Sequence, residues 1–225
     1  HFRYATILEM FADNEAATST YAFLLQKFPG HPQLDPRYLI NLSYTDPRAA
    51  FDEILSRPAD SQDWTNLRIT PILNQISSSL PDDFQLQVGI AEALLPHLPS
   101  LMKEARSSQQ TVAPDPFSFH PGQKIQWFSN FLASLERGTR YKEVYIPALL
   151  EDSSSIDTSD LSSIEQAELS QLRTRQMSVY RRFLETSLEH QNDDYHSFIQ
   201  LTKLCSLKKY PTEDLRKIAR RLALN

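Results

Sequence analysis

The chain has 225 residues, a formal net charge of −5 and 40% hydrophobic residues, values that are typical of an ordinary globular protein. With only 4 glycines it is a poor candidate for glycine-dependent phosphate loops or dinucleotide-binding turns, and its single cysteine excludes an internal disulfide framework and a four-thiolate zinc site. No uninterrupted apolar run approaches the ~20 residues that a transmembrane helix needs.

Apolar residues recur three and four positions apart along most of the chain, which is the spacing of a helix face. In chain order, the predicted stripes are Ala17, Tyr21, Leu24 and Phe28; Phe84, Val88, Ala91 and Leu95; Ile125, Phe128, Leu132 and Leu135; Leu169, Leu172, Val179 and Phe183; Tyr195, Phe198, Leu201 and Cys205; and Leu215, Ile218, Ala219 and Leu222. The best strand candidate is Val144-Tyr-Ile146, but it falls within a stronger helical pattern. We therefore predict roughly ten to twelve helices, most of them short and one of about 28 residues that ends near His190.

Proline and capping residues mark where these helices begin and end. Capping side chains precede first-turn prolines at Asp35-Pro36, Asp46-Pro47 and Thr70-Pro71. Ser162 and Glu165 have the spacing of a capping box at the start of the long helix. Pro96 and Pro99 predict a break or kink in the helix that starts near Asp82.

Short helices joined by tight, proline-containing turns are typical of stacked helical hairpins. We therefore predict an all-α fold, an irregular stack of antiparallel helical hairpins that forms a curved right-handed array, as in a HEAT-like α-solenoid or an α-α superhelix. No fixed repeat period is found, so no repeat family is predicted. Residues 1–225 are expected to form one domain, with a subdivision into 1–110 and 122–225 as the alternative. Because both ends fall at helical patterns, we expect the chain to be a fragment of a larger protein.

Two segments lack the helical pattern. Residues 111–123 contain three prolines and are expected to cross the surface between helical layers. Residues 151–163 are rich in serine and acidic side chains with little to bury, which predicts a mobile loop. Ser154 stands three residues before Asp157, as an acidophilic kinase would require, and is a candidate phosphosite. Ser162 has a similar setting but is better explained as an N-cap.

Charge is distributed unevenly along the chain. Residues 1–172 contain 12 basic and 22 acidic residues, whereas residues 173–225 contain 11 basic and 6 acidic residues. The basic residues come in groups: Arg173 and Arg175, Arg181 and Arg182, Lys208 and Lys209, and Arg216, Lys217, Arg220 and Arg221. A basic surface of this kind suits an acidic partner segment or a nucleic-acid backbone. The competing interpretation is that these are solvated helix faces with ordinary surface pairs, such as Arg181 with Glu185.

No segment carries a recognisable catalytic motif: the nucleophile elbow, the phosphate-binding loop and the His-Glu-x-x-His pattern are all absent. His190, Asp194 and His196 come closest to a metal-binding group, but a new helix is expected to begin between them. Cys205 falls on an apolar stripe, so we predict a small core residue rather than a nucleophile. We predict no catalytic residue, no metal site and no cofactor.

The predicted function is a non-catalytic scaffold or adaptor within a larger intracellular complex, nuclear or cytoplasmic. Its predicted partners are other protein subunits that carry an acidic segment, and no membrane is involved. The candidate contact residues are Arg175, Arg182, Arg216, Lys217, Arg220 and Arg221, together with Trp127, which points away from the stripe of Phe128. Two alternatives stay open: a nucleic-acid-associated helical domain that uses the same basic residues, and an enzyme whose site is assembled across the stack.

Overall fold

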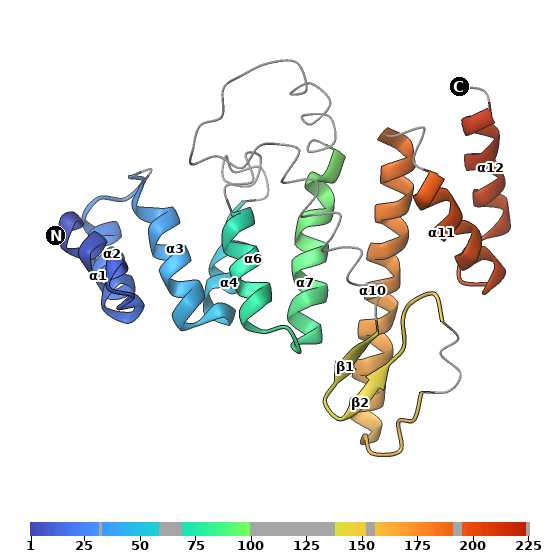
Figure 1. Cartoon of the computed structure of the whole chain (residues 1–225), viewed down its shortest axis with the longest axis horizontal. Coiled ribbons are helices and arrows are strands. Elements are labelled where there is room, and N and C mark those ends of the chain that lie inside the picture. Colours follow the sequence, from blue (N-terminus) through green and yellow to red (C-terminus); the bar gives the residue numbers. More distant parts are fainter. Residues whose placement is uncertain (32, 59–68, 100–137, 152–155, 191–194, 224–225) are drawn as a thin grey trace. The chain divides into compact units, whose positions relative to one another are not determined.

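The computed structural model describes residues 1–31, 33–58, 69–99, 138–151, 156–190 and 195–223 (Figure 1). Helices account for 74% of these described residues and include nine α-helices, so the prediction of a mainly helical chain is confirmed. Strand is limited, within the same residues, to one short hairpin. The chain divides into two compact units, His1–Pro81 and Asp82–Asn225.

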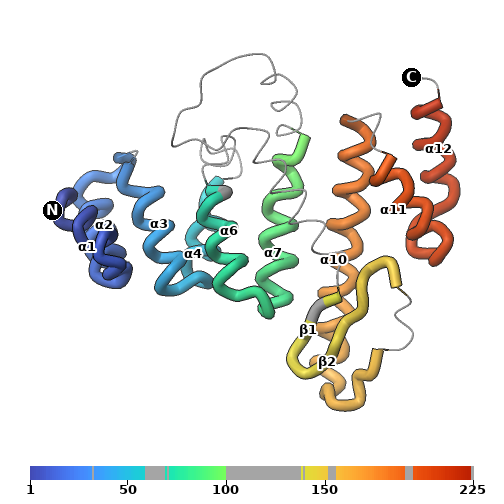
Figure 2. Tube along the Cα trace, in the orientation of Figure 1, coloured from blue at the N-terminus to red at the C-terminus, as the bar shows by residue number. Residues whose placement is uncertain are grey.

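The first unit is built from short helices that pack on their neighbours in sequence, and Figure 2 follows the chain through them. Their bounds are α1 Phe2–Met10, α2 Asn14–Lys27, α3 Leu34–Thr45, α4 Pro47–Leu55 and α6 Thr70–Ser79. Helix α2 contacts α1 and α3, and α3 also contacts α4 and α6. Ala17, Tyr21 and Leu24 are buried together with Ala5 of α1, whereas Phe28 is 59% exposed and does not continue the predicted stripe.

The predicted caps of the first unit are confirmed in one case and wrong in two. The Asp46 carboxylate accepts a hydrogen bond from the N–H of Ala49 at 3.0 Å, directly before Pro47. Helix α3 begins one residue before Asp35, so Asp35 is free to accept hydrogen bonds from the Arg57 guanidinium at 2.5 and 2.7 Å. Helix α6 begins at Thr70 and has Ile69 as its N-cap.

A polar bridge that the sequence pattern does not predict joins α1 to α3. Glu9 forms an ion pair with Arg37 and accepts a hydrogen bond from the Asn41 amide at 2.6 Å. The same amide nitrogen donates to the Arg37 carbonyl at 2.7 Å, which satisfies a side chain that is only 2% exposed. The bridge therefore lets a polar residue of α3 face the neighbouring helix without an unpaired amide.

The second unit is organised around one long helix, as Figure 1 shows. Its elements are α7 Phe84–Leu94, a 3₁₀ turn η1 Leu95–His97, strands β1 Thr139–Tyr141 and β2 Val144–Ile146, and helices α10 Ser163–His190, α11 Tyr195–Ser206 and α12 Thr212–Ala223. Helix α10 contacts α7 and α11, and α11 contacts α12. One apolar cluster joins α7, the hairpin and α10; its buried members are Phe84, Val88, Tyr141, Val144, Ile146, Leu161, Leu169 and Leu172.

The long helix agrees closely with its prediction. Helix α10 has 28 residues, and its predicted stripe is buried. The N–H of Ser162 donates to Glu165 at 2.9 Å and the N–H of Glu165 donates to Ser162 at 3.4 Å, which is the predicted capping box. The predicted break near Pro96 is also confirmed, since α7 gives way to the 3₁₀ turn there.

The helical assignment of Val144-Tyr-Ile146 is wrong. These residues form β2, which pairs antiparallel with β1 and places Tyr141 opposite Val144. Val144 and Ile146 are buried, whereas Tyr145 between them is 60% exposed, which is the period of a strand. Pro147 disfavours a helical backbone at the preceding residue, and this local signal supports the strand.

The predicted face of α11 is confirmed at Leu201, which is fully buried, and wrong at two other positions. Tyr195 is 76% exposed and Cys205 is only half-buried, so two members of the predicted stripe are not in the core. The residues that α11 buries are Ser197, Gln200, Leu201 and Leu204. Two of these are polar, and the hydrophobic pattern therefore indicated a face that is rotated away from the true one.

We expect Asp46→Ala to lower the free energy of unfolding by about 1 kcal/mol, because the N–H of Ala49 loses its capping acceptor. Urea denaturation followed by circular dichroism measures the change. Asp52→Ala removes an exposed carboxylate from the same helix and is the matched control, for which we expect little change. Equal losses in the two variants would show that the cap contributes nothing specific.

The capping box also predicts a pH dependence. A hydrogen bond from Lys142 and two from Ser162 lower the pKa of Glu165 to about 2 from its ordinary 4.5. Since the folded pKa lies below the unfolded one, this stabilisation is present above pH 4.5 and is lost as the pH falls toward 2. In Lys142→Met we expect the urea midpoint to decrease less than in the unsubstituted chain when the pH is lowered from 4.5 to 2, because the pKa of Glu165 is then lowered less. Glu143→Gln, an exposed neighbour in the hairpin turn, should leave it unchanged, and an identical fall in Lys142→Met and the unsubstituted chain would contradict the link.

Candidate anion-binding pocket

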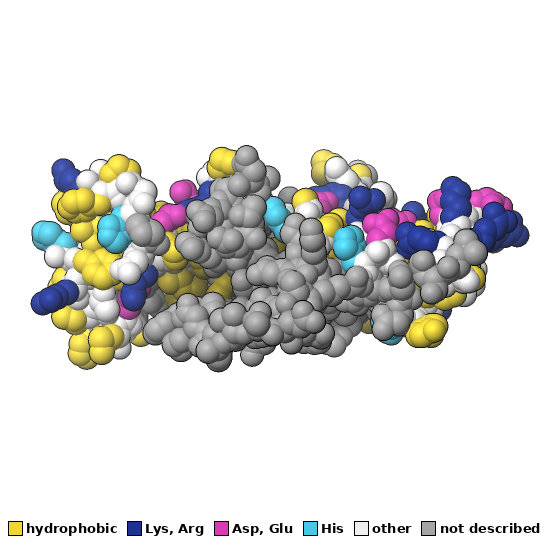
Figure 3. Space-filling model, turned by 90° about the horizontal axis from the view of Figure 1, so that it is seen from above, with side chains coloured by type: hydrophobic (Ala, Val, Ile, Leu, Met, Phe, Trp, Pro, Cys, Tyr) yellow, Lys and Arg dark blue, Asp and Glu magenta, His cyan; other side chains and the backbone are white. Residues whose placement is uncertain are grey.

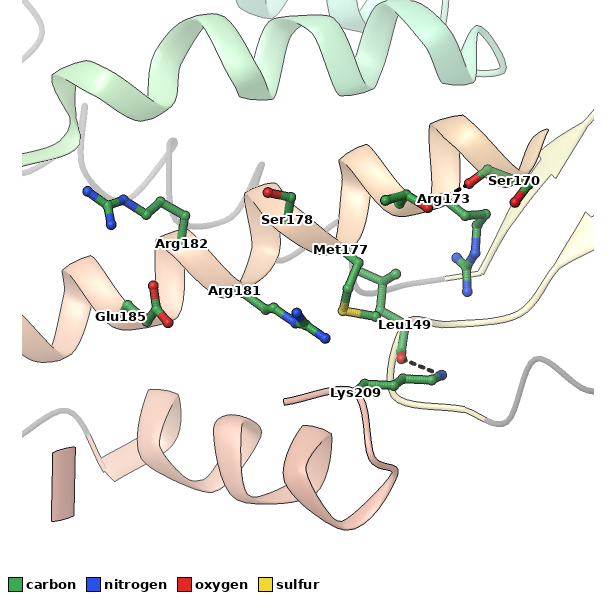
Figure 4. A pocket seen from close by; sticks show the side chains of 10 residues that line it. Leu149, Ser170, Arg173, Met177, Ser178, Arg181, Arg182, Glu185 and Lys209 are labelled. Atoms are coloured by element: carbon green, nitrogen blue, oxygen red, sulfur yellow. Dashed lines mark hydrogen bonds between the residues drawn. The ribbon is translucent and has the colours of Figure 1, made fainter. Parts of the chain in front are cut away.

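A pocket of about 680 Å³ lies along α10 in the second unit (Figure 4). Its lining residues are Leu149, Ser170, Arg173, Thr174, Met177, Ser178, Arg181, Arg182, Glu185 and Lys209. The lining therefore contains four cationic side chains and one carboxylate. Hydroxyl groups and two apolar side chains complete it.

The helical repeat of α10 sorts these residues into two rows. Arg173, Met177, Arg181 and Glu185 follow one another at intervals of four residues, and so do Ser170, Thr174, Ser178 and Arg182. The rows face outward because the intervening positions, such as Leu172, Val179 and Phe183, are buried. In Figure 4, Arg173 and Arg181 extend toward Lys209 and Leu149, whereas Arg182 points to the other side of the helix.

The two arginines that extend into the pocket form no ion pair with a carboxylate among the described residues. Arg173 donates to the amide oxygen of Gln176 at 3.0 Å, and burial lowers the pKa of its guanidinium because the cation loses solvation. The Nε of Arg181 is buried and has no hydrogen-bond acceptor in the described part of the chain, and the guanidinium lies 6.0 Å from the ring centroid of Tyr210. Within the described part of the chain, no carboxylate forms an ion pair with Arg173, Arg181 or Arg182. A partly desolvated cation in this state favours the entry of an anion.

The remaining charged groups of the pocket are fixed by other contacts. The hydroxyl of Tyr210 donates to Glu185 at 2.7 Å, and the predicted surface pair of Glu185 with Arg181 does not form. Burial and then the Glu185 carboxylate raise the pKa of Tyr210, so its hydroxyl stays protonated and keeps donating. The Lys209 ammonium donates to the carbonyls of Leu149 at 3.1 Å and Glu151 at 2.5 Å. Its positive charge is thereby held at the wall opposite α10.

The predicted contact residues fall into different settings. Of those that the structure describes, Arg182 alone lines the pocket, and Arg175 instead donates to Glu92 of α7 at 2.9 and 2.6 Å. On α12, Arg216 pairs with Glu213 at 2.5 Å and Lys217 with Asp214 at 2.9 Å. Figure 3 shows this mixture of basic and acidic side chains at the C-terminal end of the chain.

Two other residues of α12 and two single residues complete the predicted set. Arg220 is exposed, and Arg221 is half-buried with two guanidinium nitrogens that have no hydrogen-bond partner among the described residues. Trp127 and the candidate phosphosite Ser154 lie outside the described residues. The assignment of a contact surface to these residues stays a prediction.

Three pocket cations, Arg173, Arg181 and Lys209, were not among the predicted contact residues. The sequence does place Arg173 and Arg181 in the basic groups of the last third of the chain. A sharper signal is their spacing around Met177, since residues four apart share a helix face. Lys209 carries no comparable signal, because it approaches from a turn that is distant from α10 in sequence.

The groups with the residue types of catalysis or metal binding are engaged in local contacts. His190 lies 3.0 Å from the carbonyl of Thr186, and His196 lies 3.3 Å from the amide nitrogen of Gln200. Asp194 is outside the described residues. The Cys205 sulfur lies 3.4 Å from the hydroxyl of Thr212. Among the described residues, no three His, Cys, Asp or Glu side chains are grouped so that they could hold a metal ion.

Within the described ranges, no helix has the length and apolar character needed to cross a membrane. No protein-family model matches the chain, and comparisons with curated proteins and with solved structures find no significant match.

The contrast between Arg175 and the pocket arginines leads to a prediction about stability. Both partners of the Arg175–Glu92 pair are about one-third exposed, so we expect a coupling energy of about 0.2–1 kcal/mol in a double-mutant cycle. The cycle uses Arg175→Gln, Glu92→Gln and the double variant in urea denaturation. Arg182→Gln is the control on the same helix and should change stability little. A coupling energy of zero would show that the pair does not fasten α7 to α10.

Proposed function

We propose that the chain is a non-catalytic scaffold or adaptor segment that binds an acidic segment of a partner protein in the α10 pocket. The observation that carries the proposal is the set of cations in that pocket, two of which extend into it without a carboxylate partner among the described residues. Desolvated arginine forms short, charge-assisted hydrogen bonds with carboxylates, often through both ends of the guanidinium. An acidic side chain entering the pocket would supply the countercharge that these arginines do not receive from the described residues.

The shape and the other lining groups suit a peptide segment. The volume of about 680 Å³ lies in the range of ligand sites and admits a few side chains. Leu149 and Met177 offer an apolar surface between the cations, and the flexible thioether of methionine adapts to different aliphatic neighbours. A segment with one or two acidic residues beside an aliphatic one would meet both kinds of surface.

Several observations favour a protein partner over nucleic acid. Arg216 and Lys217 already pair with acidic residues of α12, so the basic groups do not add up to one continuous phosphate track. Tyr210, which lies against Arg181, is only 5% exposed and does not offer a stacking platform for bases. The overall charge of −5 also opposes association with a polyanion. Binding of nucleic acid is therefore treated as the alternative result of the binding experiment described below.

The helical architecture supports the scaffold part of the proposal. In the first unit, consecutive helices pack on one another, as they do in stacked hairpins. We infer that the chain belongs to an α-solenoid or α-α superhelix of this kind within a larger complex. The lone cysteine suits a reducing compartment, which for this proposal is the cytoplasm or the nucleus. This part is an analogy of architecture and is weaker than the argument from the pocket.

The proposal predicts saturable binding of an acidic peptide. The probe is a short fluorescent peptide that contains two glutamates next to a leucine, and the measurement is fluorescence anisotropy. We expect Arg173→Gln and Arg181→Gln each to raise the Kd about tenfold, since each removes a charge-assisted hydrogen bond. Arg216→Gln, which removes an exposed and already paired cation, should leave the Kd unchanged.

The same titration is repeated with a peptide that has glutamine in place of glutamate, and with single-stranded RNA. Binding of the glutamate peptide alone, with the expected loss in the pocket variants, supports the proposal. Tighter binding of RNA with a steep salt dependence would replace the proposal by the nucleic-acid alternative. No difference between the glutamate and glutamine peptides would overturn it.

A further inference from the structure

Arg181 and Glu185 line the same pocket, yet they do not pair with each other. They stand four residues apart on one row of α10, a spacing at which an arginine and a glutamate can meet. No ion pair forms between the two side chains, and in Figure 4 Arg181 extends along α10 away from Glu185. Opposite charges that lie within reach and stay apart indicate that another contact holds at least one of them.

Tyr210, in the turn before α12, contacts both charged groups. Its hydroxyl donates to the Glu185 carboxylate at 2.7 Å, and the Arg181 guanidinium lies 6.0 Å from the centroid of its ring. Tyr210 is only 5% exposed, so the packing around the ring fixes the direction in which the hydroxyl points. Each of the two charges is therefore engaged by the tyrosine rather than by the other charge.

We propose that Tyr210 is a positioning residue of the pocket, whose hydroxyl holds Glu185 away from Arg181 and so keeps that guanidinium open to the acidic segment of the partner. This inference rests on the proposed function, because it names what keeps the binding site accessible. Glu185 is then an internal competitor of the ligand, since both offer a carboxylate to the same arginine.

The contact with the ring leaves Arg181 able to bind a carboxylate. An aromatic ring attracts a cation through its face and uses none of the N–H donors of the guanidinium. The Nε of Arg181 has no acceptor among the described residues, and no other contact of this side chain with a carboxylate is formed there. The donors of Arg181 are thus the groups for which Glu185 and a ligand would compete.

The hydrogen bond from Tyr210 has two advantages over the alternative pair. An i, i+4 pair in which the arginine precedes the glutamate has the weaker of the two orientations on a helix. A hydrogen bond to an ionised acceptor is stronger than one between neutral groups. Burial and then the Glu185 carboxylate raise the pKa of Tyr210, so the hydroxyl keeps its proton and continues to donate at neutral pH.

The first test is Tyr210→Phe, which keeps the ring beside Arg181 and removes only the hydroxyl. If Glu185 then pairs with Arg181 in about four molecules of five, the Kd of the glutamate peptide rises about fivefold, because apparent affinity falls with the competent fraction. Fluorescence anisotropy measures the change. Tyr141→Phe is the matched control, since Tyr141 is 7% exposed and does not line the pocket, and it should leave the Kd unchanged.

The second test is rescue by Glu185→Gln. This substitution removes a negative charge from the pocket and should tighten binding of the glutamate peptide in either background. The inference predicts that it tightens binding about fivefold more in the Tyr210→Phe background, because there it also removes the competitor of the ligand. A purely structural role of the hydroxyl predicts no such rescue, since the hydroxyl is missing from both proteins that are compared.

A third measurement needs no ligand. Arg181→Gln, Glu185→Gln and the double variant are compared by urea denaturation, with Tyr210 present and again in the Tyr210→Phe background. The shifts of the urea midpoint should add when Tyr210 is present, because the two side chains do not interact. They should not add in the Tyr210→Phe background, where the ion pair forms.

These measurements separate the inference from the proposed function. Additive effects of Tyr210→Phe and Glu185→Gln on the Kd overturn the positioning role and leave the acidic-segment proposal standing. Coupling of Arg181 with Glu185 in urea while Tyr210 is present overturns the positioning role as well, and so does an equal loss of affinity in Tyr141→Phe. Failure of the unsubstituted chain to bind the glutamate peptide overturns the proposed function and, with it, the role of Tyr210 in binding.

Discussion

The second unit depends on the burial of one face of α10. Leu169 and Leu172 near its beginning pack into the cluster shared with α7 and the hairpin, and Val179, Leu184 and Leu188 continue the buried face toward its end. A helix that is held along its length by apolar contacts has little freedom to rotate about its axis, because rotation would expose this face to water. The polar rows are thereby fixed in direction. Because the leucines of α10 are buried in the core, Arg173 and Arg181 lie on the solvent-facing side of the same helix. Their spacing along that side follows from the helical repeat.

The arginines of α10 differ in whether a described carboxylate lies within hydrogen-bonding distance. Arg175 lies two residues after Arg173, but it faces Glu92 of α7 and forms two hydrogen bonds with it. That contact raises the pKa of Arg175, whereas burial without a carboxylate lowers the pKa of Arg173. The opposite directions of these shifts express the same distinction in electrostatic terms. Among the described residues, Arg175 has a carboxylate partner and Arg173 has none, and the proposed binding of an anion rests on this difference.

The sequence predicts those features whose causes are local. The capping box of Ser162 and Glu165, the cap at Asp46 and the 3₁₀ turn at Pro96 depend on residues within a few positions of one another, and all three are confirmed. The long helix is confirmed because apolar residues recur along most of its buried face, which also contains Gln176, Thr186 and Ser187. The predicted face of α11 is wrong at Tyr195 and Cys205 because α11 instead buries the polar residues Ser197 and Gln200, which a hydrophobic pattern assigns to the surface. The hairpin at residues 139–146 depends on pairing and on the cluster beneath it, which a window of sequence does not contain.

The pocket also depends on contacts between residues that are distant in sequence, which a local pattern does not predict. The charge asymmetry of the sequence indicates residues 173–225, where most of the pocket cations lie. It does not show which of these cations pairs with a carboxylate. Arg216 and Lys217 pair with acidic residues within one turn of α12. Arg175 pairs with Glu92, which is eighty-three residues away in sequence, whereas Arg173 donates to the neutral amide of Gln176. The Lys209 ammonium is held at the pocket by hydrogen bonds to the carbonyls of Leu149 and Glu151, which follow the hairpin. The pocket wall is therefore made by three segments that are distant in sequence. An anion bound there would bridge α10 to the turn before α12 by charge, so that binding and the packing of these segments would stabilise each other.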